Sequence, residues 1–315
     1  MPTMSGFVDF GPEKDIPSLK DKVIFITGGT AGLGRASVEA LAKHDPAHIY
    51  FTGRNAQAGE SLISNIKKTN PAVGMTFVKM DMKSLASVKK ACDEFLHDRL
   101  DILMCNAGIM DEPLAVSEDG FEIHFAVNHL AHAMITQRFL PTMLKTAEMP
   151  GSDVRLIFLT SVGWQMHPKN GIVFDSLRSK QEGLSMLGFS LRYGQSKLAN
   201  ILYAAEMARR YPSIKAVSVH PGVVATDLVN NLPKMKKAMV YLTNWLTGIS
   251  VVDEKMGRLS QLWTAAGASR DELVNEAYYM PVGVLSNDTL DKTAKSEELA
   301  RELWLYTEDA LSKVV

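Results

Sequence analysis

The chain has 315 residues, of which 46% are hydrophobic and 22% are charged, and its formal net charge is −1 at pH 7. This composition is that of an ordinary globular protein, and so small a net charge gives no general attraction to nucleic acid or to anionic membranes. Cys92 and Cys105 are the only cysteines, which argues against a disulfide framework and favours a reducing compartment such as the cytoplasm.

The N-terminus has acidic residues early and no apolar core, so we expect no signal peptide. No uncharged apolar stretch is long enough to span a membrane. The length suits one α/β domain with extensions, and no linker divides the chain. Residues 1–20 are punctuated by Pro and Gly, and we expect an extension that lies on the surface.

The first regular element is a short apolar run over 23–26, which ends in the sequence TGGTAGLG. Apolar residues at helical spacing follow from Leu33 onward, so the pattern predicts a buried strand, a glycine turn and the N-terminus of a helix. Glycines allow a pyrophosphate to approach the main chain, and the helix dipole would face that anion. A lone glycine turn is weak evidence, because an ordinary strand–helix connection has the same pattern.

Strand-like runs then recur over 48–52, 75–80 and 101–105. Helical spacing between these runs predicts helices over 58–68 and 85–96. Strands that alternate with helices in this way indicate βαβ units and a parallel sheet that is covered on both faces.

The middle of the chain continues this alternation. We predict a long helix over 121–144, interrupted only near its end by Pro141. Buried strands are predicted over 154–159 and 215–219, on either side of a helix over 193–210. Beyond them we expect two helices, over 233–246 and 253–265, and a mostly polar, helical C-terminal cap.

Polar residues occupy the positions where the predicted strands end. Ligands of an open parallel sheet bind outside the carboxyl ends of its strands. Random polar loop residues would not repeat this placement strand after strand, so the pattern supports a ligand site at that edge. These residues are Thr27, Arg54, Asp81, Asn106, Ser161 and Thr226.

The sharpest chemical signal is the pair Tyr193 and Lys197, which lie one helical turn apart on the same face. A phenol has an ordinary pKa of about 10 and is a poor base at neutral pH. A nearby ammonium would lower that pKa toward the range in which the phenol can shuttle a proton. The alternative is an ordinary amphipathic helix that happens to carry both residues.

Taken together, these motifs resemble the short-chain dehydrogenase/reductase family over about residues 20–285. The runs FEIHFAVNHL over 121–130 and IYFTGR over 49–54 are similar to the retinol dehydrogenase branch, as is the long separation of Ser161 and Tyr193. Cys105 departs from the family pattern, which usually has an Asn at that position. The matching motifs are Thr27-Gly28-x3-Gly32-x-Gly34, Asp81, Asn106-Ala107-Gly108, Asn128, Ser161, Tyr193-x3-Lys197 and Pro221-Gly222.

The resemblance implies a single doubly wound Rossmann-type α/β domain, with a parallel sheet, helices on both faces and a helical substrate lid. In this interpretation the nucleotide-binding domain covers residues 21–285 and its lid covers about 229–252. Residues 286–315 would form a helical extension. A homodimer through the helices that carry Asn128 and Tyr193 is also implied, unless the C-terminal extension covers them.

The resemblance also assigns the catalytic residues. Tyr193 would be the acid/base that protonates a carbonyl oxygen as hydride arrives. Lys197 would lower the pKa of Tyr193 and hold the nicotinamide ribose, and Ser161 would hydrogen-bond the substrate oxygen. Asn128 would hold a water that links Lys197 to solvent. The structural alternatives are that Ser161 is an ordinary turn residue and that Asn128 is a helix residue whose amide is fully hydrogen-bonded within the protein.

The end of the second strand predicts NADP(H) as the cofactor. Enzymes that use NAD place an acid there, whereas this chain has Gly53 followed by Arg54 and Asn55. A guanidinium can grip a 2′-phosphate that an acid would repel. Asp81 would accept from the adenine amine, with helix capping as the alternative. The predicted cofactor residues are Gly28, Thr30, Gly32, Leu33, Gly34, Arg54, Asn55, Asp81, Met82, Asn106, Tyr193, Lys197, Val224 and Thr226.

The predicted substrate is a bulky, largely apolar carbonyl compound, because few charged anchors are available near the predicted pocket. Trp164, Met166 and His167 would line it together with Met235 and Met239 of the lid. A Met-rich helical stripe is more often part of a core, so these two interpretations overlap. No metal site is expected, since no His or Cys spacing suggests one.

We therefore predict an NADP(H)-dependent oxidoreductase that transfers hydride between nicotinamide and an apolar ketone, aldehyde or alcohol, with no nucleic-acid partner. A second enzymatic hypothesis is reduction of an activated C=C bond or a bifunctional reductase/cyclase, since the same hydride donor and Tyr193 could serve. The non-enzymatic alternative is an NADP(H)-sensing protein that kept the fold.

Overall fold

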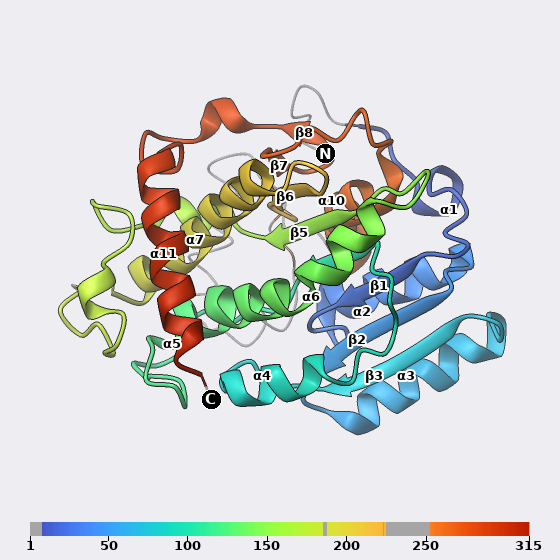
Figure 1. Cartoon of the computed structure of the whole chain (residues 1–315), viewed down its shortest axis with the longest axis horizontal. Helices are drawn as coiled ribbons and strands as arrows, with labels where there is room; N and C mark the ends of the chain where they lie inside the picture. Colours follow the sequence, from blue (N-terminus) through green and yellow to red (C-terminus); the bar gives the residue numbers. More distant parts are fainter. Residues whose placement is uncertain (1–7, 185–187, 223, 225–252, 315) are drawn as a thin grey trace.

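The computed structural model describes residues 8–184, 188–222, 224 and 253–314. Its centre is a sheet of eight strands in the order β3-β2-β1-β4-β5-β6-β7-β8 (Figure 1). The strands are β1 Val23–Ile26, β2 His48–Gly53, β3 Gly74–Lys79, β4 Ile102–Cys105, β5 Arg155–Leu159, β6 Lys215–Val219, β7 Tyr278–Met280 and β8 Val284–Leu285.

All neighbouring strands are parallel except β7 and β8. The order of the strands reverses between β1 and β4, where Ile26 lies opposite Met104 and, on the other side, Phe51. A crevice at such a reversal is where doubly wound sheets bind ligands. The six predicted strands are confirmed within one residue at each end, whereas β7 and β8 are too short to give a periodic signal.

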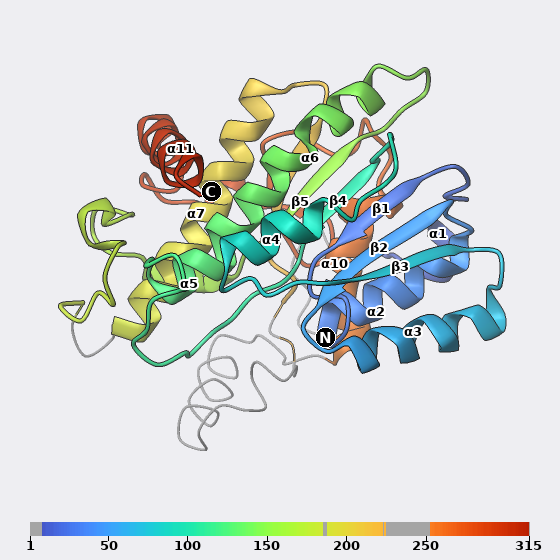
Figure 2. The same cartoon turned by 60° about the horizontal axis from the view of Figure 1, so that its bottom comes forward.

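Helices cover both faces of the sheet, as predicted (Figure 2). Alternate strand residues define the two layers, because successive side chains of a strand point to opposite faces. Val23 and Phe25 pack with α4, α6 and α7, whereas Ile24 and Ile26 pack with α2, α3 and α10. These helices are α2 Gly32–Leu41, α3 Ala56–Thr69, α4 Leu85–Cys92, α6 Ala131–Ala147, α7 Gly188–Arg210 and α10 Glu254–Leu262.

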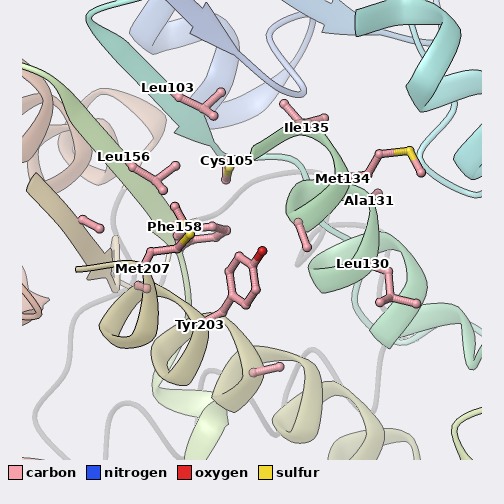
Figure 3. Packing of buried hydrophobic residues seen from close by; sticks show 14 of the residues in the cluster. Leu103, Cys105, Leu130, Ala131, Met134, Ile135, Leu156, Phe158, Tyr203 and Met207 are labelled. Carbon is pink, nitrogen blue, oxygen red and sulfur yellow. The ribbon is translucent and has the colours of Figure 1, made fainter. Parts of the chain in front are cut away.

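Helices α6 and α7 enclose the larger of the two cores against the sheet. Figure 3 shows Tyr203 pointing from α7 into the space between Phe158 of β5, Cys105 of β4 and Ile135 of α6. All four side chains are fully buried. This packing fixes α7, the helix that carries Tyr193 and Lys197, relative to the strand ends.

The long helix predicted over 121–144 has a different form. It begins as α5 Ile123–Phe125, widens into a π-helical segment η2 Ala126–Leu130 and continues as α6. Pro141 lies inside α6 without ending it. The irregularity of this helix is therefore at the segment that contains Asn128, and π-bulges of this kind are frequent at functional sites.

Other boundaries also differ from the predictions. The helix predicted over 85–96 ends at Cys92, because Phe95 leaves it to pack on Tyr50 and Phe139. The helix predicted over 253–265 ends as a π-helical segment, η5 Trp263–Gly267. Short 3₁₀ helices lie at η1 Ala42–His44, η3 Val162–Met166, η4 Phe174–Ser176 and η6 Asn287–Thr289.

Both terminal segments, as far as the structure describes them, are anchored to the cores by buried side chains. Near the N-terminus, α1 Pro12–Asp15 is followed by Ile16, which is buried. At the C-terminus, α11 Glu297–Ser312 packs on α7, where Trp304 stacks on Tyr203 at 5.2 Å between ring centroids. The predicted helix over 233–246 and the lid over about 229–252 lie outside the described residues.

Candidate active site

The glycine turn between β1 and α2 depends on positions at which a side chain would not fit. Gly28 and Gly32 have positive φ angles of 67° and 52°, which favour glycine. A Cβ on Gly34 would lie 2.2 Å from the carbonyl oxygen of Gly28 and 2.5 Å from Nδ2 of Asn106. Because Ala31 gives α2 no side-chain cap, the first N–H groups of the helix are available to an anion.

Three of the predicted catalytic side chains meet beyond the end of β5. Ser161 follows this strand, and α7 carries Tyr193 and Lys197. Ser161 lies close enough to Tyr193 for its side chain to lower the pKa of the phenol. The Nζ atom of Lys197 lies 5.7 Å from the centroid of the Tyr193 ring and donates to the carbonyl oxygen of Leu159 at 3.2 Å. The structure thus brings the three groups together, and their catalytic roles remain predictions.

Two glycines allow η3 to approach α7 closely enough for this arrangement. A Cβ on Gly163 would lie 2.8 Å from Cε1 of Tyr193. One on Gly194 would lie 2.6 Å from the carbonyl carbon of Met166 and 2.8 Å from the carbonyl oxygen of Gly163. Sequence reasoning missed both glycines, because each is isolated in the chain and only the fold shows what it faces.

The electrostatics of the pair differ from the expectation. Burial raises the pKa of Tyr193, and the nearby side chain of Ser161 lowers it by a smaller amount. Burial also lowers the pKa of Lys197 from 10.5 to about 8. The expected lowering of the phenol pKa by Lys197 is absent, because both groups lose hydration and loss of hydration by the phenolate is the largest effect.

Asn128 lies in the π-helical segment, with both hydrogens of its side-chain amide engaged. Its Nδ2 donates to the carbonyl oxygen of Ile109 at 3.1 Å and to Oγ of Ser196 at 2.9 Å, and its Oδ1 accepts from the N–H of Ile109 at 2.8 Å. A Cβ on Gly108 would lie 3.2 Å from Oδ1 of Asn128 and 3.4 Å from Nζ of Lys197. Asn128 and Lys197 therefore border the same residue, and the water between them remains a prediction.

An open depression of about 660 Å³ lies beyond the ends of β2 and β3. Its lining residues carry two cationic side chains and no carboxylate. Sequence reasoning missed Lys79, which ends β3 directly opposite Gly53; only the strand register could have revealed it. The depression is lined by Thr30, Arg54, Asn55, Ala56 and Lys79.

Gly53, at the end of β2, is held against the glycine turn. A Cβ at this position would lie 2.4 Å from Oγ1 of Thr30, a distance that forces one of them to move. Any side chain here, including a carboxylate, would displace Thr30 from the edge of the depression.

Asp81 and Met82 follow β3. The carboxylate of Asp81 accepts from the N–H of Lys83 at 3.0 Å through Oδ1, and its own N–H donates to Oγ of Ser87 at 3.0 Å. Met82 is buried in the core. Asp81 therefore supports the turn before α4, which agrees with the helix-capping role considered as the alternative to adenine binding. This role uses Oδ1 of its carboxylate.

The predicted substrate residues near Ser161 have three different environments. Trp164 is buried, and its ring stacks on His167 and meets Tyr278 edge-on. Nε2 of His167 lies 3.0 Å from Oδ2 of Asp291, in the C-terminal segment. Met166 is 45% exposed. A role for these side chains in a substrate pocket remains a prediction.

The remaining predicted residues lie around α10. A Cβ on Gly257 would lie 2.4 Å from Cγ2 of Val224 and 3.0 Å from Cδ2 of Leu33. Gly257 therefore brings these two predicted cofactor residues to one point. The other predicted residues of this region lie outside the described residues: Thr226, Met235 and Met239.

A buried acid–imidazole pair beside Tyr193 was not predicted. Oε1 of Glu122 lies 2.9 Å from Nδ1 of His124 and 3.8 Å from a guanidinium nitrogen of Arg192. The His124 ring meets the Tyr193 ring edge-on at 6.3 Å between centroids. Glu122 thus connects the start of α5 to Arg192, the residue that precedes Tyr193. The periodicity of the sequence gives no sign that the side chains of Glu122 and His124 are buried.

The described residues contain neither a metal-binding cluster nor a membrane-spanning helix. No group of three His, Cys, Asp or Glu side chains gathers in a way that could hold a metal ion. In the same part of the chain, no helix combines the length and the apolar character needed to cross a bilayer.

The sequence is similar to that of known oxidoreductases. The sequence model of the short chain dehydrogenase family matches residues 22–176. An uncharacterised oxidoreductase of Schizosaccharomyces pombe is 32% identical, over 93% of this chain and 86% of that protein. Human retinol dehydrogenase 14 is 31% identical, over 91% of this chain and 85% of its own length.

The fold is also similar to that of a solved structure. The NADPH-bound carbonyl reductase from chicken fatty liver superposes with a TM-score of 0.62 at 22% identity, over 90% of this chain and 99% of that one. This likeness confirms the Rossmann-type α/β fold class.

Proposed function

This chain belongs to the short-chain dehydrogenase/reductase family of oxidoreductases, in its retinol dehydrogenase-like branch, and from that premise we propose that it is an NADP(H)-dependent carbonyl reductase. The observation that carries this proposal is the meeting of Ser161 and Tyr193, with Lys197 beside the phenol ring, beyond the end of β5 and next to the strands where the order of the sheet reverses.

The residues present fit a dinucleotide. The turn that Gly28, Gly32 and Gly34 form leaves the main chain open to a pyrophosphate, and the uncapped N-terminus of α2 faces it with free N–H groups. Asn106 lies against the same turn. When bound there, NADPH supplies a hydride to the carbonyl carbon.

The side chains of this protein would handle the proton and the developing charge. The hydroxyl groups of Ser161 and Tyr193 would both donate to the substrate oxygen, which stabilises negative charge as it develops. Tyr193 would then release its proton to that oxygen. With a pKa of about 8, Lys197 is mostly protonated at neutral pH and would stabilise the resulting phenolate.

The depression at the ends of β2 and β3 supports NADP(H) over NAD(H). Arg54 and Lys79 give it two positive charges, which suit a 2′-phosphate. The position at which an NAD-dependent enzyme places its acid is Gly53, where a side chain would collide with Thr30. Both observations favour the phosphorylated cofactor.

We further propose a bulky, apolar carbonyl compound as the substrate. Support comes from the aromatic and thioether side chains of Trp164 and Met166, which lie in the short 3₁₀ helix η3 after Ser161. The name of the human relative, a retinol dehydrogenase, refers to a bulky, apolar alcohol.

Both cysteines are free, which supports a reducing compartment such as the cytoplasm. A homodimer remains a prediction, and α11 covers part of α7.

Replacement of Tyr193 by Phe tests the proposal. We expect kcat to fall roughly 10²- to 10⁴-fold, because the proton donor is lost, while the Kd for NADPH stays within about twofold. Tyr203→Phe is the matched control: this tyrosine is also on α7, and its buried hydroxyl has no partner among the described residues. An unchanged kcat in Tyr193→Phe, measured as NADPH oxidation over a panel of apolar ketones and aldehydes, would refute the mechanism.

A further inference from the structure

Two buried side chains connect the π-helical segment of Asn128 to the end of β1. Nδ1 of His132 lies 3.0 Å from the carbonyl oxygen of Asn128, and Nε2 of the same ring lies 2.8 Å from Oγ1 of Thr27. That hydroxyl also accepts from the N–H groups of Asn106 and Ala107, both at 2.9 Å. His132 and Thr27 are each 0% exposed, so water does not compete for these bonds.

The chemistry of these groups fixes the direction of every hydrogen bond. A carbonyl oxygen can only accept, so Nδ1 of His132 must carry the proton. Burial lowers the pKa of His132 to about 4, so the ring is neutral and its Nε2 must accept. Thr27 therefore donates its one hydroxyl proton to His132, at a distance shorter than the 3.4 Å to the carbonyl oxygen of Met104.

The outcome is a hydroxyl with all of its bonding capacity used. Because the proton of Thr27 is committed to His132, both lone pairs of Oγ1 point to the N–H groups of Asn106 and Ala107. The Nδ2 atom of Asn106 in turn donates to the main-chain oxygen of Thr27 at 2.8 Å. The imidazole ring of His132 is thus connected through Thr27 to the turn that follows β4.

We propose that His132 is a positioning residue that couples the turn of Asn106 and Ala107, on the cofactor side, to the helical segment of Asn128, on the catalytic side. This inference rests on the proposed function. It requires a ring with one donor and one acceptor nitrogen at this position, because the ring meets a pure acceptor at one end and a hydroxyl at the other. An apolar ring of similar size would remove the acceptor of the Thr27 hydroxyl proton and the side-chain donor to the carbonyl oxygen of Asn128.

The same helix offers a matched control. His129 is also 0% exposed and lies next to Asn128, but its Nε2 is 3.0 Å from Oγ1 of Thr307, in the C-terminal helix. Each histidine therefore bonds one buried threonine hydroxyl. Thr27, in the His132 pair, contacts the turn of Asn106 and Ala107, whereas Thr307 lies in the C-terminal helix. Comparison of the two pairs therefore distinguishes an effect on cofactor binding from a general effect on stability.

The experiment compares His132→Phe and Thr27→Val with His129→Phe and Thr307→Val. For each we would measure the melting temperature, the Kd for NADPH by fluorescence titration, and kcat. We expect all four to lower the melting temperature, since each leaves a buried polar group unpaired. Only the first two should raise the Kd for NADPH, roughly tenfold.

The double variant of Thr27 and His132 sharpens this test. Its Kd should rise no further than that of one single variant, because both changes break the same connection. The conservative variant Thr27→Ser, which keeps the hydroxyl, should restore the Kd. Equal effects from the two pairs, or fully additive effects in the double variant, would overturn the inference.

A second measurement uses the wild-type protein without cofactor. In ¹⁵N-histidine NMR, the resonances that disappear in His132→Phe identify this ring, and we expect its proton on Nδ1. A proton on Nε2 would overturn the inference whatever the cofactor affinity. Failure of the wild type to bind NADPH would instead refute the proposed function, so the two failures are distinguishable.

Discussion

The two ends of strand β5 each lie beside a buried cation, and the two cations have opposite surroundings. At the start of the strand, Arg155 is 4% exposed. Its guanidinium donates to the carboxylate of Asp153 at 3.0 Å and to the carbonyl oxygens of Thr264 and Ala268 at 2.9 and 2.7 Å. Its charge is therefore neutralised by a carboxylate, and four of its five N–H groups donate hydrogen bonds.

At the other end of the strand, Lys197 is 5% exposed. Among the described residues its ammonium donates to the carbonyl oxygen of Leu159 and meets no carboxylate. Burial therefore lowers its pKa to about 8. A buried charge without a counter-ion destabilises the fold, and such a cost is typical of groups that are kept for chemistry.

The largest effect on the free energy of unfolding should come from replacing Arg155, the buried cation that has a carboxylate partner. In Arg155→Met, the Asp153 carboxylate loses its buried partner and two carbonyl oxygens lose their donors, so we expect a loss of about 3–5 kcal/mol in the free energy of unfolding. Arg270→Met is the control, because Arg270 pairs with the same carboxylate at 3.1 Å but is 37% exposed. We expect it to cost less than about 1 kcal/mol. Equal losses in urea unfolding would contradict this account.

Replacement of Lys197, the buried cation without a carboxylate partner among the described residues, should raise the free energy of unfolding instead of lowering it. Lys197→Met replaces a buried ammonium by an apolar chain of similar length, so at pH 7 we expect the free energy of unfolding to rise by about 1–3 kcal/mol. The same variant should lose most of its kcat. A variant that is less stable than the wild type would show that Lys197 supports the fold.

The pH dependence of this gain has a definite direction. Between pH 8 and 10.5 the unfolded chain still holds the Lys197 proton that the folded chain has lost. The stability of the wild type therefore rises with pH in this window relative to Lys197→Met. The advantage of the variant should be complete below pH 8 and should vanish as the pH approaches 10.5. A constant difference in parallel urea titrations would disprove the assigned pKa shift.

A smaller effect is expected from the exposed cations at the ends of β2 and β3. In Arg54→Gln and in Lys79→Gln we expect the Kd for NADPH to rise roughly tenfold, or about 1.4 kcal/mol, while the Kd for NADH changes less than about twofold. Lys68→Gln is the control, since Lys68 lies on α3 and bonds only Asn65 among the described residues. A tighter wild-type complex with NADH than with NADPH would end the assignment of NADP(H).

Local patterns predicted much of the fold and the central chemistry. The apolar runs predicted six strands, because a buried parallel strand can be recognised from its local composition without knowledge of the tertiary structure. The glycine turn and the pair of Tyr193 and Lys197 are also local in sequence. Their meeting with Ser161 followed from the family resemblance, and the structure shows that they do meet.

Features that depend on distant parts of the chain were not predictable. Lys79 enters the depression through the register of β3 on β2, and His132 acts on Thr27 across more than one hundred residues of sequence. The π-helical segment around Asn128 leaves no mark in a helical pattern. The pKa of Tyr193 was predicted in the wrong direction, because a sequence cannot show how much hydration a side chain loses.

The most direct test of the central claim is the fate of the hydride. NADPH deuterated at C4 of the nicotinamide would be incubated with an apolar enone that offers both a C=O and a C=C bond. We predict deuterium on the carbinol carbon of an alcohol product with the wild type, and almost none with Tyr193→Phe. Deuterium on the β-carbon of a saturated ketone, or no transfer from any member of an apolar carbonyl panel, would contradict the account.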